Sequence, residues 1–262
     1  MSVNGTTAVA LTVAGSDSGG GAGIQADLKT FHALGVFGTT AITAITCQNP
    51  QRVTAVQPVR PDIVAGQIDR VLEAFRVGGA KTGMLYNAAI IEAVADRLRR
   101  WRFSNLVVDP VMVATSGAML LKPNAVTVLK ARLFPRATVV TPNLIEAEIL
   151  AGRRIRSLDE LREVARALTE QHDVPFLVKG GHLRGAKRAV DVLYDGRRFH
   201  EFSAPLIPRI RTHGTGCTYS AAIAANLALG YGLVDAIGRA KIFVTRAIRD
   251  AVRIGNFHAL KI

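Results

Sequence analysis

The chain of 262 residues has little of what membrane-spanning, secreted and nucleic-acid-binding proteins usually contain. Its two cysteines, Cys47 and Cys217, are too few for a disulfide framework and fit a reducing cytosol. It has no run of 18 apolar residues and no basic N-terminal patch followed by an apolar stretch, so we expect neither a membrane span nor a signal peptide. A single Trp and an aromatic content of 6% argue against a base-stacking surface. The expected location is cytoplasmic.

Positive charge exceeds negative charge, because 33 Lys and Arg residues against 20 Asp and Glu residues give a net charge of +13. The basic residues form small separate groups, for example at 97–102, 153–156 and 184–188. No DNA- or RNA-binding motif accompanies them. The pattern therefore predicts a solvated basic surface, with attraction of phosphate-bearing substrates as the alternative, and neither a nucleic acid nor a membrane is an expected partner.

Strand-like and helix-like segments alternate along the chain. Buried strands are predicted at the short apolar or β-branched runs 8–14, 39–47, 79–82, 106–109, 138–141 and 175–179. Helices are predicted at 24–34, 62–75, 88–100, 158–171, 216–229 and 234–254. A late hairpin is predicted where Asp195-Gly196 separates 190–194 from 197–202. The alternation predicts an α/β fold with a central, mostly parallel sheet and helices on both faces, and the lack of a Pro- or Ser-rich linker predicts one domain over 1–262.

Polar and Gly-rich segments fall where the predicted strands end. In parallel sheets, ligands bind beyond the carboxyl ends of the strands, so these segments predict one shared binding site. They are the loop 15–23, Gln48-Asn49, Asp109, Asn143, 179–181 and 212–217.

The segment 212–218, with the sequence THGTGCT, precedes an Ala-rich helix. Glycines allow backbone N–H groups to turn toward an anion, and the N-terminus of the helix adds partial positive charge. The segment therefore predicts a phosphate site, with a plain Gly-rich helix cap as the alternative. Cys217 falls in the first turn, where the pKa of a thiol can fall, and is a candidate base for a substrate hydroxyl. A small buried residue is the alternative for Cys217.

The Gly-rich loop 15–23 resembles a dinucleotide fingerprint only superficially, because Gln48-Asn49 stands where an acidic residue is expected. A side-chain amide suits the edge of an aminopyrimidine, although a satisfied loop residue is the alternative for Gln48. No G-x-x-x-x-G-K-[ST] motif is present, which excludes a P-loop kinase.

Oxygen ligands at the end of one strand and the start of the next helix indicate a magnesium site. Asn143 and Glu146 lie three residues apart on one helical face, and together they suit a hydrated Mg²⁺. An N-terminal cap with an acidic first turn is the alternative. Asp109 adds negative charge near the metal, and Lys179 offers a cation for the phosphates of ATP.

In this order, the segments resemble the ribokinase superfamily and, within it, the hydroxymethylpyrimidine/phosphomethylpyrimidine kinases of thiamine biosynthesis. The matching stretches cover nearly the whole chain: AGSDSGGGAGIQADLKTF, ITAITCQN, AKTGML, VVDPVMVATSG, VTPNLIEAEIL, VKGGH and THGTGCT. The resemblance implies a ribokinase-like three-layer sandwich, a homodimer, and ATP and Mg²⁺ as cofactors. It also implies phosphorylation of 4-amino-5-hydroxymethyl-2-methylpyrimidine to its monophosphate and then to the diphosphate.

The resemblance further implies a role for each matched residue. A pyrimidine pocket is expected from Gly15, Asp27 and Gln48, with Ala22, Met84 and Val111 as its walls. An anion hole is expected from Gly214, Thr215, Gly216 and Cys217, with Cys217 as the base. A magnesium and nucleotide site is expected from Asn143, Glu146, Asp109 and Lys179.

Four segments differ from the pattern that this family usually shows. They are Pro50-Gln51-Arg52-Val53 in the substrate-covering flap, Thr115 where a lysine is usual, Arg211 where an asparagine is usual, and the ending Gly255-Asn256-Phe257-His258. The changes at Thr115 and Arg211 leave a catalytically inactive pyrimidine-binding regulator open as an alternative. A pyridoxal kinase with a related pocket is the other alternative.

Overall fold

A computed structural model describes residues 6–113, 120–181, 183, 185–207 and 213–262. Nine strands form one sheet in the order β3-β2-β1-β4-β5-β6-β7-β8-β9. Six neighbouring strands, from β2 to β7, are parallel, whereas β3 at one edge and β8 and β9 at the other run antiparallel to their neighbours. The strands are β1 Val9–Asp17, β2 Phe37–Gln48, β3 Val53–Pro58, β4 Val77–Thr82, β5 Leu106–Val108, β6 Val139–Val140, β7 Phe176–Lys179, β8 Arg188–Tyr194 and β9 Phe199–Pro205.

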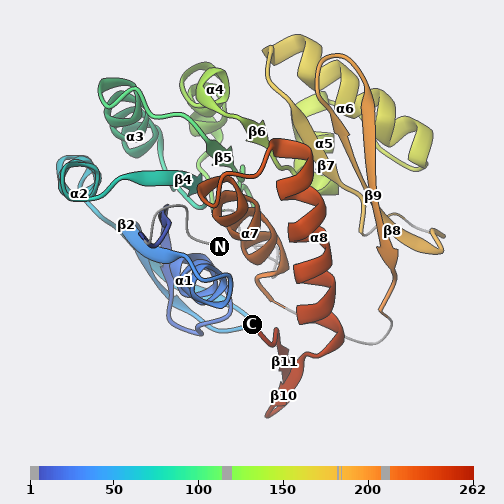
Figure 1. Cartoon of the computed structure of the whole chain (residues 1–262), viewed down its shortest axis with the longest axis horizontal. Coiled ribbons are helices and arrows are strands. Elements are labelled where there is room, and N and C mark those ends of the chain that lie inside the picture. Colours follow the sequence, from blue (N-terminus) through green and yellow to red (C-terminus); the bar gives the residue numbers. More distant parts are fainter. Residues whose placement is uncertain (1–5, 114–119, 182, 184, 208–212) are drawn as a thin grey trace.

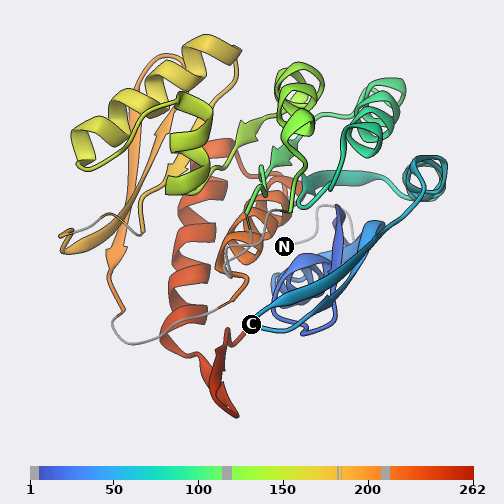
Figure 2. The ribbon, with the colours of Figure 1, turned by 180° about the vertical axis from the view of Figure 1, so that it is seen from behind.

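Helices cover both faces of the sheet (Figures 1 and 2). One core packs α1, α7 and α8 against one face, and a second core packs α2 to α6 against the other. The helices are α1 Gly23–Ala33, α2 Pro61–Ala74, α3 Ala88–Arg100, α4 Pro123–Arg132, α5 Leu144–Ala151, α6 Leu158–His172, α7 Thr215–Ala228 and α8 Leu233–Arg249, with a short 3-10 helix at Phe134–Arg136.

The central strands are apolar on both sides because both sides are covered. In β5, Val107 packs in the core beneath α7, whereas Leu106 and Val108 pack in the core beneath α3 and α4. Such strands have continuous apolar runs instead of alternating ones. The predicted α/β three-layer sandwich with a mostly parallel sheet is confirmed. In the described part of the chain, no helix is long and apolar enough to cross a membrane.

The structure corrects several predicted boundaries. The helix predicted at 234–254 ends at Arg249, and a small hairpin of β10 (Val252–Ile254) and β11 (Phe257–Ala259) follows it. The loop predicted from residue 15 begins later, because β1 continues to Asp17 and pairs there with β2. Strand β3 and helix α4 were not predicted.

Candidate active site

One cleft of about 730 Å³ lies at the carboxyl ends of the parallel strands. It brings together residues from all six of the polar and Gly-rich segments that were predicted to share one site at the carboxyl ends of the strands. Of the predicted site residues, the cleft is lined by Gly15, Ala22, Gln48, Met84, Asp109, Val111, Asn143, Glu146, Lys179, Gly214, Thr215, Gly216 and Cys217.

Asp27 does not line this cleft, so its predicted place in the pocket wall is wrong. It lies on the buried face of α1 and is fully enclosed. Lys81 Nζ lies 3.2 and 3.1 Å from its two carboxylate oxygens, and Thr12 Oγ1 donates to Oδ2 at 2.6 Å. Burial lowers the pKa of Lys81, but the charge and hydrogen bond of Asp27, together with smaller contributions from Cys217 and Asp109, outweigh burial and the net shift is upward. Lys81 lines the cleft, and its positive charge is neutralised by the buried Asp27 carboxylate, which does not line the cleft.

The anion loop is held against the Gly-rich loop by a close approach of the two backbones. Gly214 is the N-cap of α7 and has a φ of +82°, in the left-handed region that favours glycine. A β-carbon at Gly214 would overlap the carbonyl oxygen of Gly21. At Gly216, a β-carbon would lie 3.4 Å from Lys179 Nζ and 3.9 Å from Asp109 Oδ2. The N-terminus of α7 therefore faces a buried cation and a buried carboxylate.

Asp109 and Lys179 form an ion pair at the ends of β5 and β7. The ammonium nitrogen lies 2.9 Å from Asp109 Oδ1, and Ser220 Oγ donates to Asp109 Oδ2 at 3.0 Å. Burial lowers the pKa of Lys179, but Asp109 and Glu146 outweigh burial and the pKa rises. Lys179 is therefore a permanently charged donor beside the anion loop.

Asn143 and Glu146 form the capping box of α5. The Glu146 N–H donates to Asn143 Oδ1 at 3.0 Å, and the Asn143 N–H donates to Glu146 Oε2 at 2.9 Å. The capping alternative is therefore what the structure shows. Burial raises the pKa of Glu146 to about 7; Lys179 opposes this shift, and Asp109 adds to it.

These oxygens fit a magnesium ion that keeps most of its water. Within the described residues, no group of three His, Cys, Asp or Glu side chains could hold a metal. Asp109 and Glu146 nevertheless both line the cleft, and burial, with a smaller contribution from the charge of Asp109, raises the pKa of Glu146. Mg²⁺ characteristically takes one or two carboxylates and completes its shell with water and phosphate.

Cys217 is the third residue of α7 and lines the cleft. Burial raises the pKa of its thiol to about 11, although the Lys81 ammonium and the backbone of Gly23 act in the opposite direction. The expectation of a lowered pKa is therefore wrong, because desolvation outweighs the helix N-terminus and the nearby cation.

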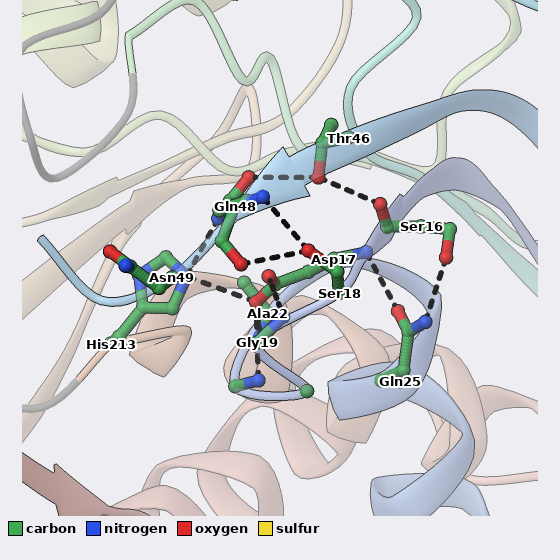
Figure 3. A network of polar contacts seen from close by, with 12 residues as sticks. Ser16, Asp17, Ser18, Gly19, Ala22, Gln25, Thr46, Gln48, Asn49 and His213 are labelled. Atoms are coloured by element: carbon green, nitrogen blue, oxygen red, sulfur yellow. Dashed lines mark hydrogen bonds and ion pairs between the residues drawn. The ribbon is translucent and has the colours of Figure 1, made fainter. Parts of the chain in front are cut away.

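Three side chains connect the Gly-rich loop, the end of β2 and the anion loop (Figure 3). Asp17 Oδ2 lies 3.2 Å from His213 Nε2, and Gln48 Nε2 lies 2.9 Å from the same ring nitrogen. Asp17 and His213 lie within segments predicted to border the site but were not named as site residues, and Lys81 was missed altogether. All three stand within stretches that carry the family resemblance. A further extension of the cleft was also missed; it is lined by residues of β8, β9 and α8, among them Asp191, Pro205, Lys241 and Val244.

The departures from the family pattern are only partly visible. Thr115 and Arg211 lie outside the described residues. Residues 50–52 lie in the turn between β2 and β3, where the N–H groups of Gln51 and Arg52 donate to Asn49 Oδ1 at 2.9 and 3.0 Å, and Val53 begins β3. The residues 255–258 form the turn and part of the small C-terminal hairpin.

Comparison with solved structures defines the class of protein. The chain is similar to a pyridoxal kinase of Bacillus subtilis solved as an ADP complex, with a TM-score of 0.89 and 38% identity over 98% of this chain and 97% of the other. It is also similar to a phosphomethylpyrimidine kinase of Clostridium difficile, with a TM-score of 0.81 and 41% identity over 92% of this chain and all of the other. The fold is thus that of a ribokinase-like vitamin kinase.

Sequence comparison then identifies the family. A family profile described as phosphomethylpyrimidine kinase matches residues 17–260, and the chain belongs to this family. The hydroxymethylpyrimidine/phosphomethylpyrimidine kinase of Rhizobium meliloti is 51% identical over 95% of this chain and 93% of its own length. The chain spans 50% of the length of a thiamine biosynthesis bifunctional protein of Geobacter sulfurreducens, with 51% identity. The predicted kinase family is therefore confirmed.

Proposed function

We propose that the chain acts as one kinase domain over 1–262 and phosphorylates the hydroxymethyl group of 4-amino-5-hydroxymethyl-2-methylpyrimidine, and then the resulting monophosphate, with MgATP. The observation that carries this proposal is that one cleft is lined by a side-chain amide, a thiol at a helix N-terminus and a buried Lys–Asp pair. From composition and resemblance, we also propose a cytoplasmic location and a homodimer. Light scattering on the purified protein tests the dimer.

The pyrimidine ring is assigned to the end of the cleft near Gln48. Apolar and backbone groups of Gly15, Ala22, Met84 and Val111 border this end. A β-carbon at Gly15 would lie 2.6 Å from Met84 Cε, so glycine at this position allows the Met84 side chain to pack against the backbone of β1. A flat ring packs against such walls, and the amide of Gln48 supplies both a donor and an acceptor at the polar edge.

Phosphoryl transfer is assigned to the start of α7. Its transition state is loose, so catalysis consists mainly of positioning and charge stabilisation. Backbone N–H groups of the anion loop and the Lys179 ammonium stabilise charge on the moving phosphoryl group. The thiolate form of Cys217, favoured by the Lys81 ammonium, takes the proton of the substrate hydroxyl onto Sγ.

Asp109, Glu146 and Asn143 would hold the magnesium ion, mostly through water. When bound, Mg²⁺ neutralises phosphate charge that develops during transfer. Among the residues of this chain, the Lys179 ammonium adds positive charge beside Asp109, and the capping box fixes the position of Glu146.

A pyridoxal kinase is the second candidate, because the B. subtilis structure with the TM-score of 0.89 is a pyridoxal kinase. Gln48 favours the aminopyrimidine, since pyridoxal has no amino group beside its ring nitrogen. The test is ADP release from MgATP, with hydroxymethylpyrimidine, its monophosphate and pyridoxal offered in parallel. Turnover on both pyrimidine species supports the proposal. Turnover on pyridoxal alone replaces the substrate, and no turnover on any of the three favours the binding-only regulator.

A further inference from the structure

One ring nitrogen of His213 faces two side chains that make opposite demands on it. His213 Nε2 lies 3.2 Å from Asp17 Oδ2 and 2.9 Å from the Gln48 amide nitrogen (Figure 3). The imidazole packs onto the Gly-rich loop, where a β-carbon at Gly21 would lie 3.1 Å from its Cδ2. A carboxylate needs a donor from this nitrogen, whereas an amide N–H needs an acceptor, and one ring nitrogen cannot satisfy both.

Asp17 determines whether His213 Nε2 is a donor or an acceptor. Its carboxylate accepts hydrogen bonds from the backbone N–H groups of Gly19, Gly21 and Ala22 at 2.8, 3.1 and 2.8 Å. Burial raises the pKa of Asp17, but the hydrogen bonds from His213 and from the backbone outweigh burial and the pKa falls below its usual value. Because the carboxylate stays ionised and has no proton to donate, the proton of this contact must lie on His213 Nε2.

The other ring nitrogen supports the same tautomer. His213 Nδ1 is buried and has no hydrogen-bond partner among the described residues. A proton on Nδ1 would leave a buried donor unsatisfied, which is rarer in proteins than an acceptor with an unused lone pair. The neutral ring with its proton on Nε2 leaves only a lone pair unused.

A proton on His213 Nε2 requires the oxygen of the Gln48 amide to face it. Rotation of the amide by half a turn exchanges its oxygen and nitrogen, whose positions are assigned from the hydrogen-bond network. The same rotation also gives the contact between Gln48 and Thr46 a donor and an acceptor. Thr46 Oγ1 donates to the Ser16 carbonyl at 2.9 Å, so its lone pairs face the Gln48 amide 3.3 Å away and need a donor there. With the amide rotated, both contacts join a donor to an acceptor.

We propose that His213 is a positioning residue, held by Asp17, that fixes the Gln48 amide with its oxygen toward His213 and its NH₂ group toward Thr46. An amide held in this way offers the substrate one N–H and one oxygen lone pair in a fixed order. A heteroaromatic ring with an acceptor nitrogen beside an exocyclic amino group matches that order in one orientation only. The pair Asp17–His213 thus selects the orientation of an aminopyrimidine. The proposal rests on the proposed contact between Gln48 and the substrate ring.

The kinetic test compares His213→Leu, which removes the donor, with His213→Gln, whose amide nitrogen keeps a donor near the position of Nε2. His213→Leu is expected to raise the KM for hydroxymethylpyrimidine by about 10-fold, because one hydrogen bond of about 1.4 kcal/mol corresponds to that factor. The change in kcat is expected to be smaller than the change in KM, and His213→Gln is expected to recover most of the KM. The positioning role would be overturned if His213→Leu lowered kcat as much as it raised the KM for hydroxymethylpyrimidine and for MgATP, and if His213→Gln recovered none of these values.

A matched control is His200→Leu. His200 Nε2 also lies against a carboxylate, 2.7 Å from Asp195 Oδ2, but this pair sits on the β8–β9 hairpin and does not line the cleft. His200→Leu is expected to keep the KM of the wild type. A rise in KM equal to that of His213→Leu would mean that the effect is general destabilisation, and would count against the proposal.

A second measurement does not depend on activity. ¹⁵N NMR of histidine-labelled protein reports which ring nitrogen carries the proton, and comparison with His213→Gln identifies the His213 signals among those of the six histidines. A proton on Nε2 supports the proposal, and a proton on Nδ1 overturns it. A failure of the proposed function would give a different result from a failure of this proposal. If Gln48 did not contact the substrate ring, Gln48→Leu would leave the KM for the pyrimidine unchanged, although NMR would still show the proton of His213 on Nε2.

Discussion

The ammonium group of Lys179 lies 2.9 Å from Asp109 Oδ1 and faces Gly216 in the first turn of α7. Two strand ends, those of β5 and β7, are thereby joined beneath a helix N-terminus. Because both charged groups are buried, the pair has two separable roles: each partner keeps the other from being an isolated buried charge, and Lys179 remains available to a phosphate.

Lys179→Met is expected to lower both stability and turnover. It leaves Asp109 buried without its cation, which costs about 3 kcal/mol or more, and it removes charge stabilisation from the phosphoryl group, which costs roughly 100-fold in kcat. The double variant Asp109→Asn with Lys179→Met is expected to regain most of the stability but none of the turnover. Urea unfolding and ADP release measure the two quantities. Recovery of turnover in the double variant would show that Lys179 acts only through stability.

Cys217 is expected to make turnover dependent on pH. Because burial raises the pKa of the thiol to about 11, the thiolate is a minor species at neutral pH, and its population grows about tenfold per pH unit as the pH rises toward that value. The kcat of the wild type should therefore rise with pH above neutrality. Cys217→Ala should lower kcat by about 100-fold or more and abolish this rise, while largely sparing the pyrimidine KM.

Cys47→Ala is the matched control for Cys217, because Cys47 is the other free cysteine and is exposed at the end of β2. Its pH profile of kcat should coincide with that of the wild type. If Cys217→Ala instead kept the rise of kcat with pH, the proton would go to another group and the assignment of Cys217 as base would fail.

Gly214→Ala is expected to cost far more than the same substitution at Gly35. Both glycines have a positive φ, +82° and +72°, so both variants pay roughly 1 kcal/mol of backbone strain. A β-carbon meets nothing within 4 Å at Gly35, whereas at Gly214 it would overlap the carbonyl of Gly21 and separate the two loops that border the cleft. Thermal unfolding and ADP release check the difference. Equal losses for the two variants would show that the loops tolerate separation.

The sequence predicted the elements whose signals are local. The run at 106–108 is apolar throughout because both faces of β5 are covered, and α3 was predicted with its observed bounds because Ile90, Ile91 and Val94 repeat at helical spacing. Strand β3 was missed because all of its residues are half-buried or exposed, so it lacks the apolar run of a central strand. The helix at 234–254 was extended too far because apolar Val252 and Ile254 continue the pattern into an exposed hairpin.

The site was predictable where its residues stand at strand ends, and less so where partners come from distant segments. Asp27 carries no sequence signal that tells a pocket wall from a buried ion pair, since its partner Lys81 lies 54 residues further along the chain. The thiol of Cys217 was expected at a lowered pKa because the helix N-terminus is visible in sequence, whereas the burial that outweighs it is not. His213 links Asp17 and Gln48 only after folding.

Glu146 is expected to make the folded protein less stable as the pH rises from about 5 to about 7. Burial raises its pKa from 4.5 to about 7, so in this interval the unfolded chain has released a proton that the folded protein still holds. The free energy of unfolding therefore falls with pH in this window. Above the window it no longer changes with pH because of this group. Glu146→Gln removes the titrating group and keeps an acceptor for the capping box. The stability difference, wild type minus Glu146→Gln, should fall by up to about 3 kcal/mol between about pH 5 and pH 7.5 in urea unfolding. A difference that stays constant with pH would show that Glu146 is already ionised at pH 5 and that the neighbouring Lys179 fully compensates its burial.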